Sequence, residues 1–269
     1  MKKIIFTLLA LNMAVLAINF NEGDYEYNKG NYQNASRIWQ KNCNDGDAKS
    51  CNNLGVLYEN ANGLKQDYKQ ASQLYKKACD GKNADGCYNL GVLYENAKGL
   101  KRDYKKASQL YKKACDNNIS DACYNLGILY KNGKGVKQNF SKTSELFAKA
   151  CNGGDAYACN NLGILYKNAK GVKQDFIKAS QLFQKACDNK IIDGCYNLGV
   201  LYENAQGLKQ NYKKAHELYK KACDNGDVHG CYNLGALYKN GKGVQKDNQK
   251  ANELYKKACK DGGCVKANK

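Results

Sequence analysis

The segment 51–60 reads Cys-Asn-Asn-Leu-Gly-Val-Leu-Tyr-Glu-Asn, and the segment 87–96 repeats it with one change, from Asn52 to Tyr88. The second half of the unit is equally regular, since Ala71–Cys79 reappears unchanged as Ala107–Cys115. The opening motif returns every 36 residues, at Cys123, Cys159, Cys195 and Cys231. A fixed period of this length is typical of a repeat architecture, in which each unit buries its apolar face against its neighbours.

Each unit is expected to form two helices joined by a short loop. Apolar side chains of the first helix recur with the i, i+3, i+4, i+7 spacing of one helical face, at Leu54, Leu57, Tyr58 and Ala61. A similar stripe in the second helix contains Tyr68, Ala71, Leu74, Tyr75 and Ala78. The chain contains no proline, as suits helices without kinks. The sequence therefore predicts an all-α fold, an α/α solenoid of stacked helix pairs.

One glycine recurs in the loop of every unit. Because no other residue type replaces it, we expect a backbone angle there that side chains resist. The small residues Gly55 and Ala71, with their counterparts, are expected to let the helices approach closely. The recurring loop glycines are Gly63, Gly99, Gly135, Gly171, Gly207 and Gly243.

The chain is expected to divide into a leader, a cap and a repeat array. Residues 1–17 combine a short basic start with an apolar stretch, which predicts a cleaved secretory signal peptide. Residues 18–50 are expected to form a partial, capping repeat, because Tyr32, Ala35, Trp39 and Cys43 precede Tyr68, Ala71, Tyr75 and Cys79 by one period. The six full repeats are expected at 51–86, 87–122, 123–158, 159–194, 195–230 and 231–266.

Fourteen cysteines in an exported chain predict a disulfide framework. We expect neighbouring cysteines to pair, as Cys43–Cys51, Cys79–Cys87, Cys115–Cys123, Cys151–Cys159, Cys187–Cys195, Cys223–Cys231 and Cys259–Cys264. A competing scheme joins Cys51 to Cys79 and Cys87 to Cys115, but it leaves Cys43 and Cys264 far apart, so we favour the neighbouring pairs. Zinc is not expected, because the spacing is not that of a zinc site and the chain has only two histidines.

The chain is strongly basic, with a formal net charge of +18. Its lysines are spread evenly, mainly as one Lys-Lys pair per repeat, which is typical of a solvated helix face. We therefore expect no nucleic-acid partner. We also expect no membrane span after signal cleavage, and no metal or other cofactor. The protein is expected to be a monomer that is secreted or periplasmic.

The pattern Asn-Leu-Gly-x-Leu-Tyr, followed by Gly-[Leu/Val]-Lys and by Leu-Tyr-x-x-Ala-Cys-Asp, closely resembles Sel1-like repeats, which are relatives of the tetratricopeptide repeat. With its regular cysteine pairs, the chain is similar to the cysteine-rich Sel1-like proteins secreted by Helicobacter and related bacteria. The resemblance covers residues 20–266 and implies an α/α superhelix with local disulfides. It also implies penicillin binding and β-lactamase activity, or engagement of host or envelope components.

The residues alone locate no catalytic site. No serine has a lysine three residues later, so the Ser-x-x-Lys motif of serine β-lactamases is absent from the sequence. A metallo-β-lactamase needs more histidines than His216 and His229. Catalytic residues therefore stay unassigned, and β-lactam hydrolysis would require an unconventional site.

Two asparagines per repeat are the candidates for ligand binding, because an amide both donates and accepts hydrogen bonds. The mid-helix set is expected to clamp the backbone of a peptide or protein segment in a concave groove, or to form hydrogen bonds between repeats. It contains Asn53, Asn89, Asn125, Asn161, Asn197 and Asn233. The second set, which begins at Asn60 and Asn96, is expected to satisfy helix ends, and the tyrosines that begin with Tyr58 are expected in the core. Two functions remain open: a binding scaffold without catalysis, and a protein that binds and hydrolyses β-lactams or binds related peptidoglycan fragments.

Overall fold

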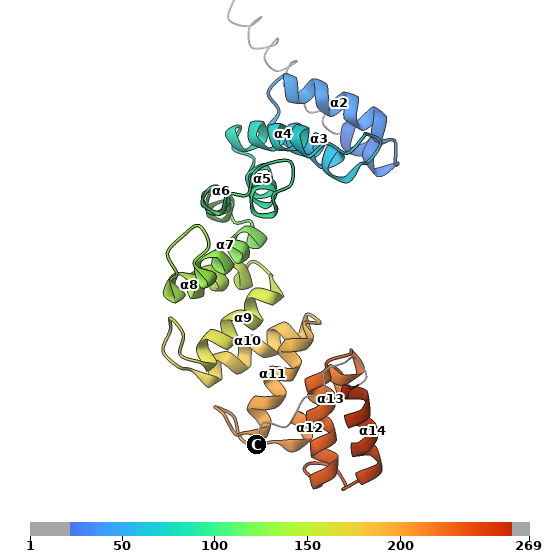
Figure 1. Cartoon of the computed structure of the whole chain (residues 1–269), viewed down its shortest axis with the longest axis vertical. Helices are drawn as coiled ribbons and strands as arrows, with labels where there is room; N and C mark the ends of the chain where they lie inside the picture. The colour runs from blue at the N-terminus through green and yellow to red at the C-terminus, as the bar shows by residue number, and fades with distance from the viewer. Residues whose placement is uncertain (1–21, 260–269) are drawn as a thin grey trace, which may run out of the picture. The chain divides into compact units, whose positions relative to one another are not determined.

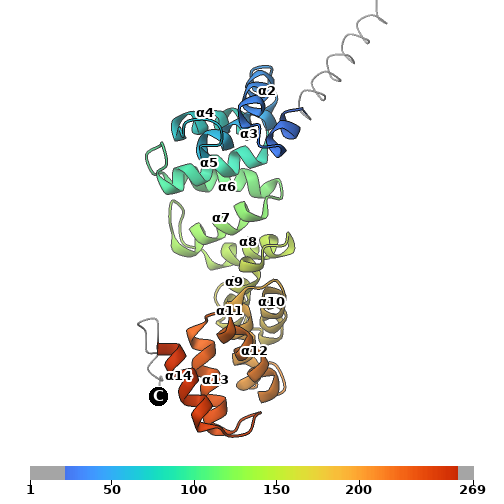
Figure 2. The same ribbon diagram turned by 90° about the vertical axis from the view of Figure 1, so that its right-hand side faces the viewer.

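A computed structural model describes residues 22–259, and all regular structure in that range is helical (Figures 1 and 2). Residues 22–28 form a short helical segment. The helices that follow are α2 (Tyr32–Asn44), α3 (Ala48–Asn60), α4 (Tyr68–Asp80), α5 (Ala84–Asn96), α6 (Tyr104–Asp116), α7 (Ser120–Asn132), α8 (Phe140–Asn152), α9 (Ala156–Lys167), α10 (Phe176–Asp188), α11 (Ile192–Glu203), α12 (Tyr212–Asp224), α13 (Val228–Asn240) and α14 (Asn248–Cys259).

Contacts divide the chain into two compact units, one ending at Gln138 and the other beginning at Asn139. In unit 1, α3 packs on α4, α4 on α5, and α5 on α6, and the first helices α3 and α5 also touch. In unit 2, the pairs α9/α10, α11/α12 and α13/α14 pack in the same way. Figure 2 shows α5, α6 and α7 following one another through unit 1. This sequential packing of helix pairs confirms the α/α solenoid.

The first helix of each repeat begins three residues before the motif cysteine and ends at the recurring asparagine or, in α9 and α11, one residue before it. Helix α3 starts after Asp47, whose side chain accepts a hydrogen bond from the Ser50 backbone N–H. It ends before Ala61, which adopts a left-handed conformation with φ of 59°. The prediction that Ala61 belongs to the apolar stripe is wrong, because the chain leaves the helix at this residue and Ala61 is exposed.

The core of each repeat lies between a second helix and the first helix that follows it. One such cluster contains Ala71 and Tyr75 from α4 with Leu90 and Leu93 from α5, and all four are buried. The predicted close approach is confirmed at Gly55, where a Cβ atom would lie 2.7 Å from the Tyr75 ring. The expected loop conformation is confirmed as well, since the six recurring loop glycines have φ between 66° and 72°.

The N-terminal repeat has the second helix of the pattern, with Trp39 at the position that Tyr75 occupies in the next repeat. Ala35 and Trp39 of α2 are buried, as their counterparts Ala71 and Tyr75 are. The indole of Trp39 fills the space beside Gly23, where a Cβ atom would lie 2.5 Å from the indole nitrogen. The predicted signal peptide, 1–17, lies outside the described residues. Among residues 22–259, no helix is both long enough and apolar enough to cross a membrane.

Six disulfides join the end of a second helix to the start of the next first helix. They are Cys43–Cys51, Cys79–Cys87, Cys115–Cys123, Cys151–Cys159, Cys187–Cys195 and Cys223–Cys231, with Cα–Cα distances of 4.4 to 4.7 Å. These are pairs of neighbouring cysteines, so the competing scheme does not describe them. The seventh predicted pair stays a prediction, because Cys264 lies outside the described residues. Each repeat from the cap onward is thus stapled to the next at a buried site.

The recurring Lys-Lys pair is more than a solvated face, because its two lysines have different partners. The first lysine meets an aspartate one turn later, as in Lys76–Asp80 at 2.7 Å and Lys220–Asp224 at 2.6 Å. The second lysine reaches back to the preceding repeat, where Lys221 donates to the Cys187 carbonyl at 3.1 Å. The same donation joins Lys77 to Cys43 and Lys257 to Cys223, and Lys185, which follows a glutamine, makes it to Cys151 at 2.8 Å. A cation at the C-terminal end of a helix satisfies its last carbonyls and opposes its dipole.

Candidate functional site

All six mid-helix asparagines are half-buried on the first helices, and several connect consecutive repeats. The Asn89 amide donates to the Asn52 side-chain oxygen at 2.9 Å, and the Asn197 amide donates to that of Asn160 at 3.1 Å. Asn53 donates to the Asp24 carboxylate at 3.3 Å. The inter-repeat hydrogen bond that the sequence left open is therefore present at these three positions. An amide can make further hydrogen bonds, so each retains capacity for a ligand.

The other asparagines of the set also touch neighbouring side chains. Asn125 lies near the Tyr111 hydroxyl and partly offsets the rise in the pKa of Tyr111, and Asn233 has the same effect on the pKa of Tyr196 and of Tyr219. Asn161 has a polar partner too. The structure thus places the set along the first helices of unit 1 and of unit 2, at the boundary between core and solvent.

A cavity of about 360 Å³ opens at the first member of the set in unit 1. Asn53 and Lys49 of α3 line it together with Asp24, Tyr27 and Trp39. Lys49 and Asp24 lie 3.6 Å apart across it, so the wall carries both a cation and an anion. The cavity has the size of a small-molecule or side-chain site. This cavity could not be predicted from the repeat pattern, because it depends on the short helical segment 22–28 beside α3.

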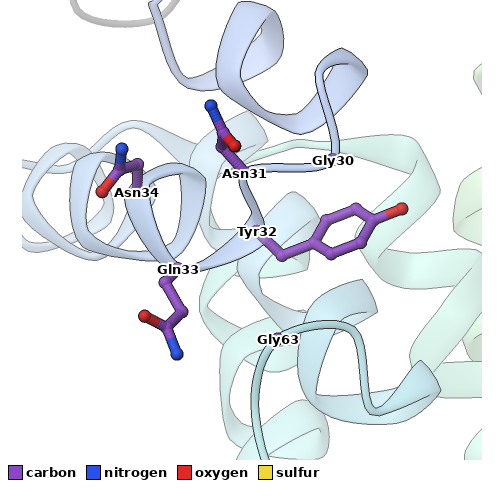
Figure 3. Close-up of a pocket in the computed structure, with 6 residues that line it drawn as sticks. All are labelled: Gly30, Asn31, Tyr32, Gln33, Asn34 and Gly63. Atoms are coloured by element: carbon purple, nitrogen blue, oxygen red, sulfur yellow. The ribbon is translucent and has the colours of Figure 1, made fainter.

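A second cavity of about 300 Å³ lies where the first loop glycine meets the start of α2. Figure 3 shows the Tyr32 side chain directed across the loop that carries Gly63, while Asn31 points away from it. Asn31 and Asn34 both donate to the Glu26 carboxylate, at 3.0 and 3.1 Å. These bonds lower the pKa of the exposed Glu26 carboxyl, with Asn34 contributing most. This second cavity forms where the Gly63 loop approaches the start of α2. The mid-helix asparagines do not line it.

Several serines and one histidine that a hydrolase could use are engaged in local structure, whereas the buried Ser50 hydroxyl has no hydrogen-bond partner among the described residues. The hydroxyls of Ser72, Ser108 and Ser180 each donate to the carbonyl three residues earlier, at 2.7 to 2.8 Å. His216 is half-buried, its ring nitrogen lies 3.1 Å from the Tyr238 hydroxyl, and burial lowers its pKa. His229 is exposed. Within residues 22–259, no group of three or more His, Cys, Asp or Glu side chains is placed to hold a metal ion.

The recurring tyrosines of the first helix lie at the edge of the core. Tyr58 and Tyr94 are half-buried and pack against the same apolar cluster. A lysine of the following second helix lies over several of these rings: Lys106 over Tyr94 at 5.1 Å and Lys214 over Tyr202 at 5.0 Å. These tyrosines therefore pack against the core as expected, and a lysine ammonium lies over the ring of Tyr94 and of Tyr202.

A buried hydroxyl–carboxylate pair repeats along the chain and was not predicted. The hydroxyls of Tyr75, Tyr111 and Tyr219 donate to Glu59, Glu95 and Glu203 at 2.7 to 2.8 Å. Burial raises the pKa of each of these tyrosines, and the carboxylate adds to the effect. Where the ring is Phe147 or Phe183, the position of the glutamate holds Lys131 or Lys167. The sequence shows this joint change in five of the six repeats, and the last repeat departs from it with Tyr255 and Lys239.

The pair is expected to be energetically coupled, and unit 2 provides the test. Tyr219→Phe is expected to cost about 1 kcal/mol, because Glu203 loses its hydroxyl donor in a half-buried place. The double variant Tyr219→Phe with Glu203→Lys copies Phe183 and Lys167, so it is expected to cost less than the sum of the single changes. Urea unfolding of the four proteins measures this coupling. Strict additivity would show that the joint change has no energetic basis.

Comparison with known proteins identifies the repeat. The Sel1 repeat model matches residues 48–83, 84–119, 120–155, 156–190, 192–227 and 228–263. This chain belongs to the Sel1 repeat family. The matches start three residues before the boundaries expected from the cysteines, which is where the first helices begin.

Several relatives and solved structures resemble this Sel1 repeat protein. A segment of 45 residues is 42% identical to HcpE of Helicobacter pylori, whose name gives it a provisional β-lactamase assignment, and the match covers 17% of this chain and 13% of HcpE. The chain thus spans only a small part of that relative. A protective antigen of uropathogenic Escherichia coli, c5321, has a TM-score of 0.89 at 27% identity, over 94% of this chain and 56% of that one. A Sel1 repeat protein from Oxalobacter formigenes has a TM-score of 0.75 at 30% identity, over 90% and 99%.

Proposed function

We propose that this Sel1 repeat protein is an exported scaffold that binds a peptide or protein segment on the face formed by its first helices. The observation that carries the proposal is the row of half-buried amides at equivalent positions of consecutive repeats, with a cavity at its first member. An extended peptide presents donors and acceptors at regular intervals, and amides satisfy both kinds. Asp24 and Lys49 add one charge of each sign at the cavity, which suits a peptide end or a charged side chain.

The proposal places the protein in the periplasm or outside the cell. Six disulfides between neighbouring helices are typical of proteins that fold in an oxidising compartment. The expected signal peptide at 1–17 supports export. We also propose that the protein acts as a monomer, with the first-helix face available to its partner.

The test of the scaffold uses a matched pair of triple variants in unit 1. A peptide selected from a random phage-displayed library on the oxidised protein serves as the probe. Replacing Asn53, Asn89 and Asn125 by alanine is expected to weaken its binding about tenfold or more, because three hydrogen-bonding amides are lost. The measurement is the dissociation constant by fluorescence anisotropy, with circular dichroism to verify the fold.

The control variant replaces Asn60, Asn96 and Asn132 by alanine. These three asparagines are also one per repeat in unit 1, but they are exposed at the ends of the first helices. The control should bind the probe as the unchanged protein does. Equal binding by both triple variants would refute the amide clamp.

A second candidate function is the binding and hydrolysis of β-lactams, which the resemblance to HcpE favours. Its test is turnover of a chromogenic cephalosporin by the oxidised protein, followed by intact-mass analysis after exposure to penicillin. Hydrolysis that copurifies with the protein would establish an enzyme, and an acyl adduct would locate its nucleophile. Absence of both turnover and adduct would leave the scaffold alone.

A further inference from the structure

The second helices of unit 1 form a separate groove on which the proposed function does not depend. A cavity of about 200 Å³ lies between α4 and α6 and is floored by α5. Its floor is apolar, because Leu90 is buried and Tyr94 and Leu110 are half-buried. The cavity is smaller than the usual site of a small-molecule ligand, which favours a single apolar side chain as its occupant.

The rim of this groove is cationic. Lys76 of α4 and Lys106 and Lys113 of α6 line it, and Asp80 is the acidic residue among the lining side chains. The Lys76–Asp80 pair, at 2.7 Å, is largely exposed and therefore contributes little to stability, so it can open to admit another carboxylate. Lys106 lies over the Tyr94 ring at 5.1 Å and 3.8 Å from Asp103. Three cations and one anion leave an excess of two positive charges around an apolar floor.

The corresponding positions in unit 2 differ in the amount or the placement of charge. Around α9 the excess is also two positive charges, but Lys178 and Lys185 both belong to α10, because Ala148 replaces Lys76 on the opposite rim. In unit 2, Gln184 stands where this groove has Lys76, and Glu217 stands where it has Gln109. Asp188, Lys214 and Lys221 are the same residue types as Asp80, Lys106 and Lys113. The set around α11 therefore has two lysines and two acidic residues, and its net charge is zero. The period thus supplies a comparison in which the helices are equivalent and the rim charge differs.

We propose that the groove between α4 and α6 binds a short acidic peptide segment that inserts one large apolar side chain between its carboxylates. The apolar side chain lies on Leu90, Tyr94 and Leu110, and the flanking carboxylates meet the lysines on either rim. Charge complementarity supports this occupant, since both the rim and the whole chain, at +18, are basic. The surface lies on second helices, apart from the asparagines of the first helices.

The experiment measures binding of a fluorescent peptide, Glu-Asp-Phe-Asp-Glu, to the oxidised protein at moderate ionic strength. Two matched peptides replace its acids by their amides or its phenylalanine by serine, and both are expected to bind about tenfold more weakly. Lys76→Gln with Lys106→Gln is expected to weaken the acidic peptide about tenfold. Equal binding of the serine peptide would overturn the inserted side chain.

Two further variants separate the groove from general attraction by a basic protein. Lys220→Gln with Lys250→Gln removes the same two rim charges from the equivalent positions of α12 and α14 in unit 2 and should leave the dissociation constant within about twofold. Gln184→Lys with Glu217→Gln gives unit 2 the rim of the α4–α6 groove, and the stoichiometry is expected to rise from one peptide to two. Equal weakening by both glutamine pairs, or an unchanged stoichiometry, would overturn the proposal.

A photo-crosslinking version of the peptide, with benzophenylalanine at its centre, locates the site. Crosslinks are expected near Tyr94 in α5 and near Leu110 in α6, the residues that line the groove. Crosslinks to Asn53, Asn89 or their neighbours on the first-helix face would overturn the groove and would instead support the scaffold proposed above.

Discussion

Replacing Cys187 and Cys195 together by alanine is expected to destabilise the junction of α10 and α11 by roughly 2.5 kcal/mol, the loop entropy that a bridge over a separation of eight residues removes from the unfolded chain. Both cysteines are buried, at 1% and 0% exposure, so the lost sulfurs also leave unfilled space in the core. The Lys221 cap on the Cys187 carbonyl at 3.1 Å remains available, because it bonds the backbone. The measurement is native-state hydrogen exchange of the amides in α10 and α11.

The pattern of protection distinguishes a local staple from a general stabiliser. A repeat contacts mainly its neighbours, so exchange in α10 and α11 should accelerate much more than exchange in α13 and α14. The variant Cys187→Ala alone, which leaves Cys195 as a thiol, should behave like the double variant. Uniform acceleration along unit 2 would contradict the local account. Because the sulfurs are buried, reduction of the unchanged protein should also speed up with denaturant.

The repeat architecture and its disulfides could be predicted because the helix motifs and the cysteine pairs recur with the same period of 36 residues. The neighbouring cysteine pairs are favoured because they use all fourteen cysteines, whereas the competing scheme leaves Cys43 and Cys264 far apart. The contacts between repeats could not be predicted in the same way. Lys185 with Cys151 and Asn197 with Asn160 are separated by 34 and 37 residues. A period of 36 places such side chains one repeat apart, but the angle between successive helices decides which of them meet.

The candidate site shows the same limit. The sequence identified the amides that begin with Asn53 because asparagine is a poor mid-helix residue, and it left open whether they face a ligand or the next repeat. Asn89 uses one amide proton on Asn52 and is half-buried, so the structure gives it a structural role, and the rest of its hydrogen-bonding capacity is not used by that bond. The cavity beside Asn53 depends on the segment 22–28, which departs from the repeat. Periodicity carries no information about such exceptions.

The recurring loop glycine leads to the second large effect, at Gly243. Its φ is 71°, and a Cβ atom there would lie 2.5 Å from the Tyr212 backbone carbon and 2.6 Å from the Tyr212 Cβ. Those atoms belong to the start of α12 and cannot rotate away as a flexible side chain does. Gly243→Ala is therefore expected to destabilise unit 2 by about 3 kcal/mol, the sum of a left-handed alanine and an overpacked contact. Urea unfolding followed by circular dichroism measures the loss.

Gly226→Ala is the matched control, because Gly226 has a φ of 88° in the same unit with no neighbouring atom within 4 Å of the added carbon. It is expected to cost about 1 kcal/mol, the conformational part alone. The chain itself shows that this part is tolerated, since alanine adopts φ of 53° to 59° at positions 61, 97, 169 and 205. Equal losses at the two glycines would mean that the backbone angle alone keeps the residue fixed. A larger loss at Gly243 would show that the repeats keep a glycine there because each loop rests directly on the backbone of the preceding second helix.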